Sequence, residues 1–216
     1  MIAALDPRNS FWDYLTSLDM STPQRHQCLI YEGPPSRHLP ALAATLQQKL
    51  NDNYRCLYLN TPVMVAGMRS YPQGLDIWHN TSKGSLVLSS DRHHLLEDRF
   101  EIDRLIAALE DALDRSIKDG FAGLWVTGDM SWEFGPQRDF SKLLEYETRL
   151  EEFLQQHPTL SGICQYHADT LPPEALRQGL LTHPSIFVNE TLSRINPDYL
   201  HATNPVPAPK ANRLWQ

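Results

Sequence analysis

The chain has 216 residues, of which 41% are hydrophobic and 21% are charged, with a formal net charge of −7. This composition is typical of a globular protein with a sizeable core. The net negative charge argues against a surface that binds the phosphate backbone of nucleic acids and against a polybasic patch that binds membranes. No apolar run reaches the roughly 18 residues of a membrane span, and the N-terminus does not resemble a signal peptide. We therefore expect a cytoplasmic protein whose isolated cysteines, Cys28, Cys56 and Cys164, are reduced core thiols.

Strand and helix patterns alternate along most of the chain. Residues 28–31 and 56–59 are short apolar runs typical of buried strands, and helical spacing of leucines lies between them. Residues 60–83 are punctuated by proline and glycine and are expected to be irregular. The remaining expected elements are a strand at 86–88, a helix at 102–117 ended by Gly120, a strand at 124–127, a helix at 139–156, a strand at 163–166, a helix at 172–181 and a strand at 186–188.

This alternation predicts an α/β fold with a mostly parallel sheet and helices on both faces. Residues 1–24 are a polar, proline-punctuated leader, and residues 201–216 form a proline-rich tail expected to be extended. The part between them, residues 25–200, is expected to be a single domain.

The loop after the first strand, residues 32–38, lies where a nucleotide-binding α/β protein carries its phosphate loop. A phosphate cradle needs successive backbone N–H groups and a lysine followed by Ser or Thr. Pro34 and Pro35 remove two such donors, and the loop contains no lysine. The sequence therefore predicts a degenerate P-loop that does not bind a triphosphate in the usual manner.

A carboxylate follows the strand at 124–127. In open α/β sheets, ligands bind beyond the carboxyl ends of the strands, which is the position of Asp129 and the nearby Trp132. Asp is also a common cap of the helix or turn after a strand, so both interpretations of Asp129 remain open.

The helix at 139–156 carries a carboxylate on or beside its apolar stripe. Glu147 lies between Leu143 and Leu150, and burial of a charge is costly unless it is paired. Either Glu147 and its neighbour Tyr146 reach a pocket or a buried polar network, or Glu147 lies at the rim beside Arg149 or Arg104. An Asp129–Glu147 pair would suit acid–base chemistry if the two were close.

Other polar residues lie near strands, but they form no catalytic or metal motif. His26 precedes the first strand, where a bond to a neighbouring backbone group is its simplest role, and Gln165 and Tyr166 lie within the strand at 163–166. Histidine and cysteine spacings match no metal motif. We expect no metal and no cofactor, and the residues do not indicate an enzyme.

Several motifs occur in order: HQCLIYEG at 26–33, RCLYL at 55–59, GLWVTGDMSW at 123–132, LLEYETRLEEF at 143–153, GICQYHAD at 162–169 and LLTHPSIFVN at 180–189. Together they resemble the MEDS family of sensory domains, named for methanogens, methylotrophs and a dichloromethane-responsive regulator. The resemblance covers about residues 22–200. It implies a RecA-like fold without a working P-loop.

The resemblance also implies a function. The family is regarded as a sensor of small organic molecules and is often joined to DNA-binding, kinase or anti-anti-sigma modules. We therefore expect a small organic ligand and a signalling or transcription-regulatory protein partner, without direct contact to nucleic acid or membrane. The alternatives are a degenerate nucleotide-handling protein that uses Asp129 and a pure interaction scaffold. The expected ligand contacts are His26, Asp129, Trp132, Tyr146, Glu147, Gln165 and Tyr166.

Overall fold

The computed structural model describes residues 25–71, 76–188 and 192–195. A seven-stranded sheet forms its centre, with the strand order β3-β2-β6-β7-β1-β8-β9. All neighbouring strands are parallel except β8 and β9. The strands are β1 (His26–Tyr31), β2 (Tyr54–Leu59), β3 (Leu86–Ser89), β6 (Gly123–Asp129), β7 (Leu160–His167), β8 (Ser185–Val188) and β9 (Leu192–Ile195).

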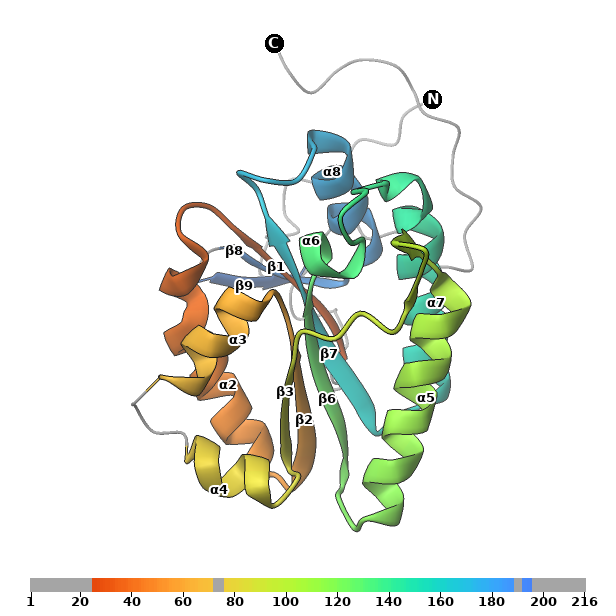
Figure 1. Ribbon diagram of the computed structural model, residues 1–216. Helices are drawn as coiled ribbons and strands as arrows, with labels where there is room; N and C mark the ends of the chain where they lie inside the picture. The colour runs from red at the N-terminus through yellow and green to blue at the C-terminus, as the bar shows by residue number, and fades with distance from the viewer. Residues whose placement is uncertain (1–24, 72–75, 189–191, 196–216) are drawn as a thin grey trace, which may run out of the picture.

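Helices cover both faces of this sheet (Figure 1). The helices are α2 (Leu39–Asn51), α3 (Pro62–Arg69), α4 (Ile77–Ser82), α5 (Ile102–Lys118), α6 (Met130–Glu133), α7 (Leu143–Gln156) and α8 (Pro173–Thr182). Side chains of α2, α3 and α4 share one core, on what we call the α2 face, and those of α5, α7 and α8 share the other, on the α7 face. The expected three-layer α/β class, with a mostly parallel sheet and helices on both faces, is therefore confirmed.

The two cores assign each strand residue to a face. In β6, Leu124 packs in the core of the α7 face and Trp125 in the core of the α2 face. Successive side chains of a strand alternate between faces, so Gly128 belongs to the α7 face and Asp129 to the α2 face. The same alternation in β7 places Cys164 on the α7 face and Ile163 on the α2 face.

The prediction that residues 60–83 are irregular is wrong, because α3 and α4 lie within this range. Pro62 occupies the first turn of α3, where its missing N–H costs no hydrogen bond. Val65 and Met68, three residues apart, are buried against the sheet. The Asp76 carboxylate accepts a hydrogen bond from the His79 N–H at 3.0 Å and caps α4.

Smaller differences concern the ends of elements. The first strand begins at His26, so this residue lies within β1 and not before it. A 3-10 turn at Phe140–Lys142 precedes α7. A two-stranded ribbon, β4 (Leu95–Leu96) and β5 (Arg99–Phe100), was not expected. The proposed leader and proline-rich tail lie outside the described residues.

The loop after β1 has the degenerate character that its sequence predicts. Pro34 precedes a 3-10 helix at Pro35–His38. The N–H of Gly33, the loop's one glycine, donates to the Asp169 carboxylate at 2.7 Å. This donor, which would face a phosphate in a working loop, therefore serves a carboxylate of the same chain.

Candidate functional site

The sheet separates the residues that the sequence analysis grouped as ligand contacts. Asp129 and Gln165 lie on the α2 face by strand alternation. Four others gather on the α7 face or on the helix that covers it: His26, Tyr146, Glu147 and Tyr166. The Asp129–Glu147 pair that acid–base chemistry would need is therefore not formed, because the two carboxylates lie on opposite sides of the sheet.

Asp129 caps the helix that follows β6. Its Oδ1 accepts a hydrogen bond from the Trp132 N–H at 3.0 Å, and its Oδ2 accepts one from the Tyr31 hydroxyl at 3.3 Å. Burial raises the pKa of this carboxyl, although both hydrogen bonds oppose the shift. Between the two interpretations of Asp129, the geometry favours the helix cap over the floor of a pocket.

Gln165 and Trp132 also bond within the protein. The Gln165 amide donates to the Thr127 hydroxyl at 2.8 Å, and that hydroxyl donates to the Ile163 carbonyl at 2.8 Å. The Trp132 indole N–H donates to the Ser90 carbonyl at 3.1 Å. These side chains stabilise the α2 face and the end of the sheet through internal hydrogen bonds.

Glu147 is the centre of a buried polar network on the α7 face. Its side chain is fully buried, and its Oε2 lies 3.2 Å from His26 Nε2 and 3.6 Å from His183 Nε2. The Tyr166 hydroxyl donates to its Oε1. The alternative position at the rim is wrong, and Arg149 pairs instead with Asp103.

His26 has a second carboxylate partner. Its Nδ1 lies 3.0 Å from Glu151 Oε2, so both ring nitrogens meet carboxylates and not a backbone group. Burial lowers the pKa of His26, but the hydrogen bonds to Glu147 and Glu151 outweigh it and raise the value to about 9.

His183 and Glu147 are shifted in the same network. Burial and the nearby His26 lower the pKa of His183 to about 4. Burial raises the pKa of Glu147, but the two histidines and Tyr166 outweigh it and hold the value below its usual range. The network therefore favours an ionised Glu147.

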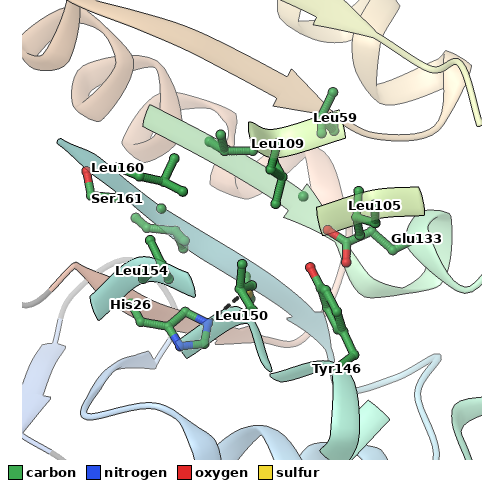
Figure 2. A pocket seen from close by; sticks show the side chains of 15 residues that line it. His26, Leu59, Leu105, Leu109, Glu133, Tyr146, Leu150, Leu154, Leu160 and Ser161 are labelled. Atoms are coloured by element: carbon green, nitrogen blue, oxygen red, sulfur yellow. Dashed lines mark hydrogen bonds between the residues drawn. The ribbon is translucent and has the colours of Figure 1, made fainter. Parts of the chain in front are cut away.

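A small cavity lies between the sheet and the helices of the α7 face (Figure 2). Its volume is about 40 Å³, and one water molecule needs roughly 10–15 Å³. Leucines of α5 and α7 form much of the wall, and the polar groups are few. The aliphatic lining residues are Leu59, Leu105, Leu109, Val126, Leu150, Leu154, Leu160 and Ile163, and the polar or ionisable ones are His26, Glu133, Tyr146, Ser161 and Cys164.

Glu133 is the polar group that stands out in this cavity. Its carboxyl interacts with the Tyr146 hydroxyl, and Figure 2 shows the two groups pointing toward one another. Its Oε2 is buried and has no hydrogen-bond partner among the residues that the structure describes. Burial, followed by the charge of Glu147, raises the pKa of Glu133 well above its usual value. A carboxyl group whose protonated form is favoured by burial therefore lies at an apolar cavity.

The sequence analysis missed three residues of the site. Glu133 lies in a four-residue helix too short to show a periodic pattern. Cys164 was interpreted as a core thiol, and His183, which caps the C-terminus of α8, lies in no recognisable metal or catalytic motif. Glu147 was identified because a carboxylate interrupts an apolar stripe, and no comparable signal marks the other three.

Comparison with known proteins defines the class. The family model "MEthanogen/methylotroph, DcmR Sensory domain" matches residues 25–184. The chain therefore belongs to the MEDS family of sensory domains, as its motifs predict. No curated protein matches the sequence.

A similar solved structure is the flagellar accessory protein FlaH from Methanocaldococcus jannaschii. It shares 13% sequence identity over 95% of this chain and 91% of that chain, with a TM-score of 0.48. In the part of the chain that the structure describes, no helix is both long enough and apolar enough to cross a membrane.

Proposed function

We propose that this domain senses a small, uncharged organic molecule, which it binds in the cavity of the α7 face. The observation that carries the proposal is Glu133, a buried carboxyl with an unpartnered oxygen at an otherwise apolar cavity. A buried polar atom without a partner is costly, and a ligand that supplies the missing hydrogen bond would recover that cost.

The cavity chemistry indicates the ligand class. A protonated Glu133 donates a hydrogen bond, so the ligand carries an acceptor such as a hydroxyl, ether or carbonyl oxygen. The leucine-rich wall favours a short hydrocarbon part. Anionic ligands are disfavoured because the neighbouring Glu147 is itself ionised. The small volume limits the ligand to a few heavy atoms.

The signal is proposed to leave through α5 and α7. Both helices line the cavity and also present solvent faces, on which Ile117 and Leu144 are 47% and 36% exposed. A change in the packing of these two helices on ligand binding would therefore alter a surface that a protein of a transcription or kinase pathway can contact.

Thermal denaturation with a panel of short-chain alcohols, ethers and ketones tests the proposal. A ligand that binds only the native state stabilises it by about 2.7 kcal/mol at 100 times its dissociation constant. We expect a subset of the panel to raise Tm and to shift the NMR signals of Leu105 and Leu109.

Two variants make this test specific. Leu109→Phe fills the cavity and should abolish the rise in Tm, whereas Leu144→Phe, at a half-exposed position of α7, should preserve it. Panel compounds that leave Tm and the leucine signals unchanged, or that act equally on Leu109→Phe, would contradict a binding site in this cavity.

A further inference from the structure

Four potential metal-ligating side chains meet beside the cavity, each from a different element, and two of them, His26 and Cys164, also line it. They come from β1, α7, β7 and the residue that ends α8, and all are buried. One donor atom of each lies within 4.8 Å of the donor atoms of the others. The four residues are His26, Glu147, Cys164 and His183.

Four of the six distances between these atoms are close to the edges of a tetrahedral metal site, and the other two are no longer than 4.8 Å. Zinc bonds of about 2.0–2.3 Å to N, O and S place neighbouring ligand atoms roughly 3.3–3.6 Å apart. Glu147 Oε2 lies 3.2 Å from His26 Nε2 and 3.6 Å from His183 Nε2. Cys164 Sγ lies 3.6 Å from His26 Nε2 and 3.9 Å from Glu147 Oε2.

The outer contacts orient these side chains as in a metal centre. A metal-bound histidine usually donates its other ring N–H to a carboxylate or a carbonyl. His26 turns Nδ1 to Glu151 Oε2 at 3.0 Å, and His183 turns Nδ1 to the Gly179 carbonyl at 2.8 Å. Both histidines therefore direct Nε2 to the centre.

Glu147 is held in the same way. Its Oε1 accepts the Tyr166 hydroxyl, which leaves Oε2 at the centre of the cluster. A thiolate and a carboxylate together would neutralise a divalent cation, which suits a fully buried site.

We propose that the chain binds one divalent transition-metal ion, best matched by Zn²⁺, through four buried side chains: His26, Glu147, Cys164 and His183. The mixed nitrogen, sulfur and oxygen donor set suits a borderline-soft ion. With four protein ligands the site is closed, so the metal would hold β1, β7, α7 and α8 together. This site goes beyond the proposed ligand cavity and does not depend on it.

Cobalt titration tests the site directly. The full chain, stripped of metal with a chelator, is titrated with Co²⁺ and followed by absorption. We expect one Co²⁺ per chain, with the intense visible bands of four-coordinate cobalt and a thiolate-to-cobalt charge-transfer band, and displacement by Zn²⁺. Titration without the four-coordinate bands would overturn the proposal.

Cysteine variants identify the sulfur ligand. Cys164→Ser should remove the charge-transfer band, and Cys56→Ser, a buried thiol of the α2 face, should retain it. A Cys28→Ser/Cys56→Ser double variant leaves Cys164 as the one thiol of the chain. A charge-transfer band in this variant therefore identifies Cys164 as the sulfur ligand, even if Cys164→Ser does not fold. Loss of the band in that double variant, while it stays folded, would contradict the assignment.

Glu151→Gln tests the positioning role of the outer carboxylate. It should keep the four-coordinate spectrum and lower the affinity for Co²⁺ by roughly 10- to 100-fold. Unchanged affinity would overturn the orienting role of Glu151. None of these measurements uses an organic ligand, so they fail or succeed independently of the panel experiment.

Discussion

The Glu133 carboxyl occupies the space beside Gly128 that a side chain would fill. A Cβ atom built at Gly128 would lie 1.9 Å from Glu133 Oε1 and 3.1 Å from Glu133 Cδ. The absence of a side chain at the penultimate residue of β6 therefore allows the carboxyl to lie against the sheet. The position of the acid at the cavity depends on this glycine.

Gly128→Ala should destabilise the protein because the added methyl displaces the Glu133 carboxyl in a closely packed core. Overpacking of this kind costs about 1–3 kcal/mol. Urea denaturation of both proteins measures the change in the free energy of unfolding. Gly67→Ala is the matched control: it lies in α3, its nearest contact is the flexible end of Leu39 at 3.3 Å, and it should be neutral or stabilising.

A double-mutant cycle assigns the cost to Glu133. Glu133→Ala removes the atoms that the new methyl would meet, so the loss from Gly128→Ala should be smaller in that background. Coupling between contacting residues is typically about 0.5–3 kcal/mol. Additive effects would show that the two residues do not compete for this space.

Glu133→Gln should gain stability relative to the wild type as pH rises. The folded-state pKa of Glu133 is raised by burial, so the native protein keeps a proton that the unfolded chain releases above about pH 4.5. Its contribution to stability therefore falls as pH rises from the unfolded pKa toward the folded one, by up to about 1.4 kcal/mol per pH unit. Gln has no proton to lose and lacks this slope.

The free energies of unfolding of the wild type and of Glu133→Gln, measured at several pH values between about pH 5.5 and pH 8, check this slope. The contributions of the other titratable groups cancel when one free energy is subtracted from the other. The control is Glu174→Gln. The hydrogen bond from Arg177 holds the pKa of Glu174 below its usual value, so its carboxyl is ionised in both states over this range. Its difference curve should be flat, and a flat curve for Glu133→Gln as well would show that Glu133 is ionised in the folded protein.

Much of the fold follows from local patterns. The strand at Leu124–Thr127 and the long helix α5 were predicted because apolar runs and 3.6-residue spacing are local properties. The helix α3 was missed because Pro62 and Gly67 resemble loop punctuation, although Pro62 opens a helix.

The site depends on relations that no local pattern contains. Central strands are buried on both faces, so the run that ends in Asp129 shows no polar alternation to tell one face from the other. Asp129 and Glu147 were therefore both named as ligand contacts, although the sheet separates them. His26, Cys164 and His183 meet only because β1 pairs with both β7 and β8.

Asp129→Ala should destabilise the domain more than Asp129→Asn. Alanine removes the helix cap at Trp132, worth about 1 kcal/mol, and the acceptor of the Tyr31 hydroxyl, whose loss costs about 1–3 kcal/mol. Asparagine keeps one acceptor oxygen and is an equally good cap, so its free energy of unfolding should stay within about 1 kcal/mol of the wild type.

Asp129→Asn also separates the two faces of the sheet functionally. Because Asp129 caps α6 from the α2 face, Asp129→Asn should retain the response to the organic panel and the Co²⁺ spectrum unchanged. Glu133→Gln supplies the contrast, since it alters a residue that lines the cavity. Asp129→Asn that abolished ligand-induced stabilisation while the protein stayed folded would contradict this separation. The binding site would then have to extend to the α2 face, where Asp129 caps α6.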